Sequence, residues 1–346
     1  YRRIDAALRE DPGNKQLRLL YARLLAANDI VAARKQFEIL SAQNPRDGDL
    51  LLSLALINRE TGDDLEAKAY LRQLLDLEQR VTEAHYYLGR IAEDAGDEEE
   101  ALARYQQVGD GRELISATQR AGRILLDRGD LQQLHAWFEQ QRSQLPQRAE
   151  QLYGLEADLL STGGNAAQAM RLLTESVARF PESASLRYAR AMLAEQQDDL
   201  ALLESDLRHI IANDPENATA LNALGYTLAD RTIRLEEAYD LIARALVLSP
   251  EEPAILDSMG WVLYRLGRID EALQYLSEAY TMFPDPEVAA HLGEVMWVSG
   301  DTEGAARVWQ GALLKDPQHD TLVSTLQRLG IDFLDMNPLH KGEVGR

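Results

Sequence analysis

The sequence of 346 residues contains no cysteine, only five lysines and no long apolar run. Without cysteine the chain can form neither disulfide bonds nor thiolate metal sites. No stretch of about 18 apolar residues occurs, so we expect no segment of this sequence to span a bilayer. Glycine and proline are sparse, at 22 and 11 residues, and most of them stand at regular positions between apolar segments.

Positive charge is also scarce. The 36 Lys and Arg residues face 57 Asp and Glu residues, which gives a formal net charge of −21 at pH 7. Nonspecific binding of nucleic acid depends on neutralisation of phosphates by Lys and Arg, so we expect no nucleic-acid partner. An anionic membrane surface is disfavoured as a direct partner for the same reason. The acidity itself is interpreted as a solvated surface.

One pattern of about 34 residues occurs three times between residues 218 and 317, which indicates a stacked repeat array. In each copy a glycine is followed by an alanine, a large apolar residue, a second alanine and a proline at the same intervals, except that the first copy has one extra residue in its middle turn. The copies are Gly225, Ala238, Ile242, Ala245 and Pro250; Gly260, Ala272, Leu276, Ala279 and Pro284; and Gly293, Ala305, Trp309, Ala312 and Pro317.

Each copy predicts two antiparallel helices. Small residues such as Gly260 and Ala272 allow two helix backbones to approach closely, and Leu263 and Leu276 fill the space beside them. Pro284 disfavours helical geometry at the residue before it, so the second helix ends there. One helix pair cannot bury its apolar face alone, so neighbouring pairs are expected to supply the rest of the core.

The same pattern extends over most of the chain and predicts an all-α fold. Residues 1–13 are interpreted as the second helix of a partial repeat, and residues 319–330 as one terminal helix. We expect a single array over residues 1–333 and a polar, frayed tail over residues 334–346. No segment alternates apolar and polar residues as strands do. Nine full units are expected to begin near residues 14, 48, 82, 115, 150, 184, 218, 253 and 286.

The turn inside each unit carries a capping residue. A short side-chain acceptor there accepts hydrogen bonds from the free N–H groups of the second helix. Arg268 departs from this rule, and Asp270 is a candidate substitute. The expected capping residues are Asp29, Asp63, Asp97, Asp130, Asn165, Asp199 and Asp301.

This pattern resembles the tetratricopeptide repeat (TPR) family. The resemblance implies an α-solenoid coiled into a right-handed superhelix, in which the first helices of the units line a concave face that binds proteins. Two interpretations of the aromatic residues there stay open: they bind a partner, or they pack against the adjacent repeat. Carried onto this sequence, the predicted protein-binding positions are Asn222, Tyr226, Asp257, Trp261, Tyr264, Arg265, Glu294 and Trp297.

No residue pattern typical of catalysis is found. The sequence has no His-Glu-x-x-His helix, no Gly-x-Ser-x-Gly elbow and no phosphate loop. His291 and Glu294 are three residues apart on one predicted helix, but no third ligand is near them in the sequence. We therefore interpret His291 as a surface histidine, and we predict no enzymatic activity, no metal and no cofactor.

Two segments carry a narrower resemblance, namely residues 224–231 (LGYTLADR) and 259–267 (MGWVLYRLG). They resemble the bacterial outer-membrane TPR lipoproteins that bind a periplasmic carboxyl-terminal processing protease. This resemblance implies a periplasmic adaptor that activates the protease and presents cell-wall hydrolases for proteolysis. Because the chain begins at Tyr1 within a predicted helix, we expect any signal peptide and lipid anchor to precede it.

Other functions stay open at this point. The chain could be a scaffold of another envelope assembly, such as pilus, secretion or polysaccharide machinery, or the repeat arm of a larger enzyme. A TPR clamp for carboxylate tails is not expected, because Asp257, Glu287 and Glu294 stand at the inner positions where such a clamp needs basic or amide side chains.

Unfolding of this array is expected to be only partly cooperative, because each unit contacts only its neighbours. Leu134 and Leu203 stand where the other second helices have alanine, so these two units are expected to open first. In hydrogen exchange followed by mass spectrometry, residues 115–144 and 184–213 should exchange faster than residues 253–282. Uniform protection from end to end would contradict this expectation.

Overall fold

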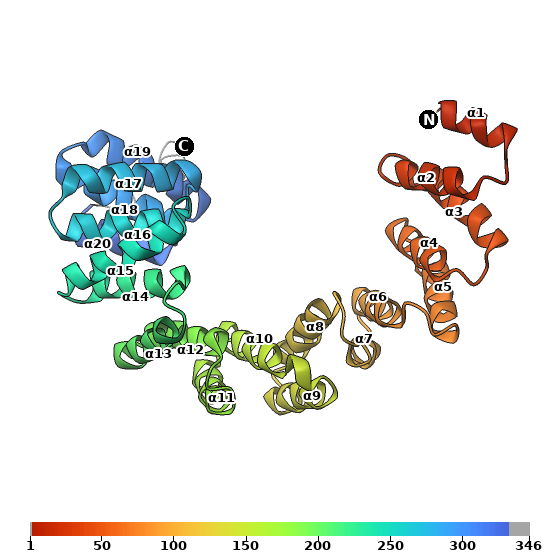
Figure 1. Ribbon diagram of the computed structural model, residues 1–346, viewed down its shortest axis with the longest axis horizontal. Helices are drawn as coiled ribbons and strands as arrows, with labels where there is room; N and C mark the ends of the chain where they lie inside the picture. The colour runs from red at the N-terminus through yellow and green to blue at the C-terminus, as the bar shows by residue number, and fades with distance from the viewer. Residues whose placement is uncertain (1, 332–346) are drawn as a thin grey trace, which may run out of the picture. The chain divides into compact units, whose positions relative to one another are not determined.

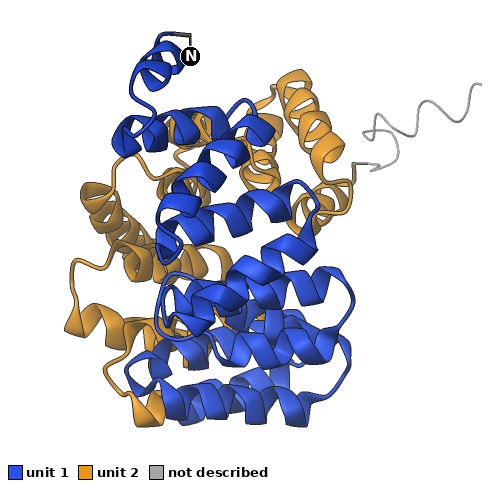
Figure 2. Cartoon of the chain, turned by 90° about the vertical axis from the view of Figure 1, so that its right-hand side faces the viewer, with its two compact units in different colours: residues 1–176 blue, residues 177–346 orange. Residues whose placement is uncertain are grey.

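The computed structural model describes residues 2–331 and, over that range, consists of twenty α-helices and one 3-10 turn without any strand. The predicted all-α class is confirmed. The predicted tail at residues 334–346 lies outside the described residues. The chain divides into two compact units, residues 1–176 and residues 177–346, which are coloured separately in Figure 2.

Unit 1 begins with a single helix, and helix pairs follow it (Figure 1). The last residues of its final helix belong to unit 2. The helices are α1 (Arg2–Glu10), α2 (Lys15–Ala26), α3 (Ile30–Gln43), α4 (Gly48–Glu60), α5 (Asp64–Asp76), α6 (Val81–Asp94), α7 (Glu98–Gln106), α8 (Leu114–Asp127), α9 (Leu131–Gln144), the 3-10 turn η1 (Pro146–Arg148), α10 (Ala149–Thr162) and α11 (Ala166–Arg179).

Unit 2 contains four helix pairs and one terminal helix (Figure 1). The first helix of every pair in the chain begins within one residue of its predicted start. The helices of unit 2 are α12 (Ala184–Gln196), α13 (Leu200–Asn213), α14 (Ala218–Arg231), α15 (Leu235–Leu248), α16 (Pro253–Arg265), α17 (Ile269–Met282), α18 (Pro286–Ser299), α19 (Thr302–Lys315) and α20 (Asp320–Arg328).

Close approach at a glycine sets the packing of α16 against α17. A Cβ atom added at Gly260 would lie 2.5 Å from Leu276 Cγ and 3.1 Å from the carbonyl oxygen of Ala272. Gly225 of α14 stands in the same relation to Ala238 and Ile242 of α15. The small residues of the repeat are therefore required by backbone proximity, as the pattern predicted.

The turns within the pairs follow the predicted chemistry at most positions. Gly267 supplies the left-handed conformation between α16 and α17, with φ +80°. The Asn165 side chain donates to the Gly163 carbonyl, and Arg268 makes no capping bond but pairs with Glu271. The side-chain caps that the structure confirms are Asp29, Asp63, Asp97, Asp130, Asp199 and Asp301.

The cores of both units are built from the apolar faces of the paired helices. Leu134 and Leu203, which replace the small residue, are both fully buried. At the end of unit 2, Trp309 of α19 is fully buried and packs in one cluster with Leu322 and Leu326 of α20. Helix α20 therefore covers the apolar face that α18 and α19 would otherwise expose.

Replacement of Gly260 by alanine tests the close approach. Because the new methyl group meets backbone as well as side chain, Gly260→Ala should lower the free energy of unfolding by about 1–3 kcal/mol. Gly311→Ala is the matched control, because its Cβ would meet only the Tyr280 hydroxyl at 3.6 Å. The control should be neutral or stabilise the helix by about 0.5–1 kcal/mol. Equal effects of both variants in urea unfolding would contradict the packing argument.

Candidate protein-binding groove

The eight predicted binding residues lie on three first helices of unit 2, namely α14, α16 and α18 (Figure 1). The structure brings most of them together with residues that lie about one repeat away in the sequence. These contacts form a buried polar network, and open cavities lie beside it.

Trp261 lies at the centre of the network. Its ring stacks on the imidazole of His291, with 4.3 Å between centroids and 24° between planes. Its Nε1 donates to Asp230 Oδ1 at 3.3 Å, and the residue is only 6% exposed. Most of the Trp261 surface is therefore used in packing between adjacent repeats, which supports the packing interpretation for this ring.

His291 is not a surface residue, and the interpretation from the sequence was wrong. Only 2% exposed, it places Nδ1 2.9 Å from Asp257 Oδ2, and Tyr226 Oη lies 3.4 Å from its Nε2. In the sequence, the spacing of His291 and Glu294 on one helix suggested only that the two side chains could share a ligand. The actual partner, Asp257, lies 34 residues away on α16.

The surroundings of His291 favour its charged form. Burial lowers its pKa, but the Asp257 carboxylate more than compensates, and Glu287 and Asp230 act in the same direction. The net result is a pKa above the ordinary value. His291 and Asp257 thus form a buried ion pair that joins α18 to α16.

The tyrosine hydroxyls extend this network. Tyr226 Oη donates to Glu287 Oε1 at 3.2 Å, and burial, followed by the nearby carboxylates, raises the pKa of Tyr226. Tyr264 Oη donates to Glu294 Oε1 at 3.1 Å. Burial and the Glu294 charge raise the pKa of Tyr264 to about 12. Both rings are therefore neutral hydrogen-bond donors at physiological pH.

Glu294 is satisfied by a residue that the sequence did not reveal. It is 1% exposed and accepts a hydrogen bond from Arg328 Nη1 at 2.9 Å. Arg328 stands at the end of α20, beyond the last recognisable repeat. Its pairing with Glu294 could have been predicted only by extending the 34-residue period into α20. The Arg265 guanidinium donates to the Asp230 carbonyl at 2.9 Å and joins α16 to α14.

Trp297 and Asn222 lie at the two ends of the predicted site. Trp297 is half-buried, and its ring centroid is 5.8 Å from that of Trp309. Asn222 is partly buried, and its Oδ1 has no hydrogen-bond partner. The buried Oδ1 atom of Asn222 is therefore a hydrogen-bond acceptor that no described protein group satisfies.

Two open cavities flank the network within unit 2. One, of about 810 Å³, is lined by Tyr226, Trp261 and His291 together with residues of α20. The other, of about 880 Å³, is lined by α12, α14, α16 and α18, with Tyr188, Asn222 and Tyr226 among its residues. Both sizes fall in the range of ligand-binding clefts, about 300–1,000 Å³.

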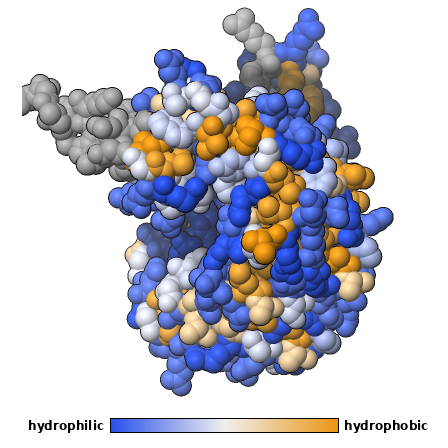
Figure 3. All heavy atoms as spheres, turned by 90° about the vertical axis from the view of Figure 1, so that its left-hand side faces the viewer, coloured by the Kyte–Doolittle hydropathy of each residue, from blue (hydrophilic) through white to orange (hydrophobic). Residues whose placement is uncertain are grey.

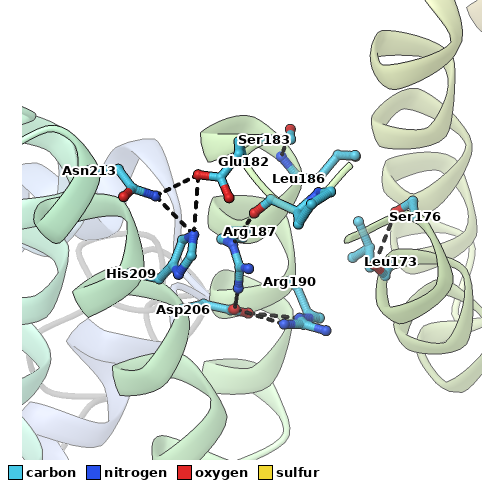
Figure 4. Close-up of polar contacts among 11 residues, drawn as sticks. Leu173, Ser176, Glu182, Ser183, Leu186, Arg187, Arg190, Asp206, His209 and Asn213 are labelled. Atoms are coloured by element: carbon cyan, nitrogen blue, oxygen red, sulfur yellow. Dashed lines mark hydrogen bonds and ion pairs between the residues drawn. The ribbon is translucent and has the colours of Figure 1, made fainter. Parts of the chain in front are cut away.

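Helix α12, which forms one side of the larger cavity, is held by a buried carboxylate. Asp206 of α13 is fully buried and accepts hydrogen bonds from Arg190 Nε at 2.7 Å and Arg187 Nη1 at 2.9 Å (Figure 4). Because two guanidinium groups from α12 meet one carboxylate, this pairing fixes the rotation of α12 against α13.

The exposed surface offers both apolar and charged contacts. Val247, Phe283 and Leu314 of unit 2 are each more than half exposed. On the face drawn in Figure 3, apolar side chains form small groups among hydrophilic ones. In the described part of the chain, no three His, Asp or Glu side chains are placed to hold a metal ion. None of the described helices is long and apolar enough to cross a membrane.

Repeated helix pairs with a small-residue contact define a class of solenoid proteins. A model of the tetratricopeptide repeat matches residues 23–67, 65–109, 155–202 and 258–320, which together make up more than half of the chain. The chain belongs to the tetratricopeptide repeat family. It is accordingly a scaffold for protein–protein interaction.

Known proteins with similar sequences are longer than the matched region. The TPR repeat-containing protein PA4667 of Pseudomonas aeruginosa is 48% identical over 214 residues, which cover 62% of this chain and 36% of that protein. The type IV pilus assembly protein PilF of Pseudomonas aeruginosa is 26% identical over 137 residues, or 39% of this chain and 54% of that protein. The chain thus spans between about a third and about half of the length of these relatives.

A solved structure shows the same fold. A tetratricopeptide repeat protein from Parabacteroides merdae aligns over 72% of this chain and 98% of its own, with a TM-score of 0.51. Its sequence identity is 15%, so the likeness concerns the fold alone.

Substitution of His291 tests the buried ion pair. Because the folded-state pKa is raised, the pair stabilises the fold fully below the unfolded pKa of about 6.5, and this stability is lost as the pH rises through the folded pKa. His291→Asn should therefore lower the free energy of unfolding by about 3 kcal/mol at pH 6, because Asp257 stays buried without its partner. The difference in free energy of unfolding between this variant and the parent protein should become smaller at alkaline pH.

Urea unfolding followed by tryptophan fluorescence measures this difference. His85→Asn is the control, because burial lowers the pKa of His85 and its contribution should vary with pH in the opposite direction. A His291 effect that grows with pH would contradict the ion pair.

Proposed function

We propose that this scaffold is the repeat portion of an adaptor for a carboxyl-terminal processing protease of the bacterial periplasm. The adaptor binds and activates the protease and helps to present cell-wall hydrolases to it. The proposal is supported by the resemblance of residues 224–231 and 259–267 to outer-membrane TPR lipoproteins with this role. These residues lie in the C-terminal halves of α14 and α16 and in the turn that follows α16, and the two helices together carry six of the eight predicted site residues.

The protein-binding part of this proposal rests on the aromatic and acidic residues that recur at equivalent positions of the first helices of unit 2. Tyr226, Trp261, Tyr264 and Trp297 come from three successive repeats, and Tyr226 and Trp261 line the cavities beside the network. Large rings with a polar handle are frequent anchors of protein interfaces. Tyr226, Trp261 and Tyr264 contact His291 or Glu294, whose own positions are fixed by ion pairs, so this part of the surface is preorganised for binding.

The proposed location follows from the same resemblance. We place the protein in the periplasm, held at the outer membrane by a lipid anchor in a segment that precedes the present sequence. The sequence contains no cysteine to which a lipid could be attached. The scaffold would then hold the protease at the outer membrane.

A second candidate is a scaffold of type IV pilus assembly. It is favoured by the similarity to the pilus assembly protein PilF of Pseudomonas aeruginosa, at 26% identity over 137 residues. The two candidates differ in their partner. Binding of the purified chain to the protease and to pilus components of one bacterium, measured side by side by biolayer interferometry, would decide between them.

Truncation of the groove tryptophans tests whether this surface carries the binding. Trp261→Ala combined with Trp297→Ala should weaken the affinity for the protein partner by about thirtyfold, which corresponds to about 2 kcal/mol. The matched control is Trp137→Ala, which removes a buried tryptophan of unit 1 and should leave the affinity unchanged.

Circular dichroism must accompany the binding measurement. Unchanged affinity of the folded double variant would remove this surface from the mechanism. If the double variant loses its helical signal, the rings serve packing, and Trp297→Ala alone becomes the test because Trp297 is the less buried of the two.

A further inference from the structure

The cavity between α12, α14, α16 and α18, here named the acidic cleft, has an unusual charge composition. Five carboxylate residues and no Lys, Arg or His line it. Asp257 is paired with His291, whereas the other four form no ion pair within residues 2–331. Those four are Glu195, Glu252, Asp285 and Glu287.

The helix ends around the cleft do not cancel this charge. The N-termini of α14, α16 and α18 border it, and each carries about half of a positive charge. Three such ends offset about 1.5 charges of the four carboxylates, so the cleft keeps a net negative potential. An acidic segment would therefore be repelled, and a basic one attracted.

Much of the remaining lining is apolar, with a few Ser, Thr and Asn side chains among it. Tyr188, Met192, Ile255, Phe283 and Val288 contribute to it, and Phe283 is 58% exposed. In an extended chain successive side chains point to opposite sides, so one side can contact the apolar residues while the other meets the carboxylates.

We propose that the acidic cleft holds an extended segment of the protein partner in which basic and apolar side chains alternate. This inference rests on the proposed function as a protein-binding scaffold and adds the chemistry of the bound segment. It also moves the contact from the largely buried Trp261 to the N-terminal halves of α14 and α16 and to α12. Glu252 is the central acidic contact, because its side chain is exposed and makes no capping hydrogen bond.

Two fluorescent peptides with identical apolar residues test the proposal on the full chain. One peptide alternates leucine with lysine, and its twin alternates leucine with glutamate. By fluorescence anisotropy the basic peptide should bind at least about tenfold more tightly than the acidic twin, and its affinity should fall as salt is added.

Charge reversal at the cleft provides the matched pair of variants. Glu252→Lys should weaken binding of the basic peptide by about tenfold, whereas Glu251→Lys, one residue outside the cleft and also exposed, should change it by about twofold or less. Circular dichroism confirms folding, and Glu252→Gln replaces the reversal if that variant is unstable.

Three outcomes overturn the proposal: neither peptide binds, the acidic twin binds as tightly, or the two charge reversals behave alike. Its failure is distinguishable from that of the proposed function. If the protease binds equally to the Glu252→Lys and Glu251→Lys variants, the adaptor role stands and the acidic cleft does not. If the basic peptide binds as expected but the protease does not, the cleft stands and the adaptor role does not.

Discussion

The close approach of two helix backbones, seen between α14 and α15 and between α16 and α17, is the constraint on which the rest of unit 2 depends. At Gly260 there is no room for a Cβ atom between α16 and α17, and at Gly225 the same holds for α14 and α15. This contact fixes the rotation of each first helix about its own axis. The same positions of successive first helices therefore face the same way, and residues about one repeat apart meet. His291 with Asp257 and Arg328 with Glu294, both 34 residues apart, are direct consequences.

Buried carboxylates give the otherwise uniform stack specific contacts. A small-residue contact can recur at every repeat and does not distinguish one neighbour from another. Asp206, Asp257 and Glu294 are buried, and each meets a cation from another helix. Because desolvation offsets most of the attraction in such pairs, their net contribution to stability is small, but loss of one partner is expensive. An alternative register that leaves one of these buried charges without its partner is therefore disfavoured.

The sequence predicted the local structure well because its signals are local. Glycine, alanine, proline and the capping aspartates each act within one helix or one turn, so the helix pairs and their starts could be derived from the period. The eight site residues were assigned to the correct helices for the same reason. Their partners were not predicted, because the choice between a solvated and a buried side chain depends on the neighbouring repeat. His291 illustrates this: no neighbour in the sequence indicates Asp257, and only the 34-residue register connects them.

Acidic residues have two separate roles in unit 2, which net charge alone cannot reveal. Asp257 and Glu294, which stand at two of the predicted binding positions, are neutralised internally by His291 and Arg328. The carboxylates that keep their charge lie nearer the N-terminal ends of α16 and α18, where Glu252 and Asp285 precede the first turns. The negative potential available to a partner is therefore displaced from the aromatic network toward the N-terminal ends of α16 and α18. A rigid, internally neutral network thus lies beside an acidic cleft, so the side chains that position the surface differ from the side chains available to recognise a ligand.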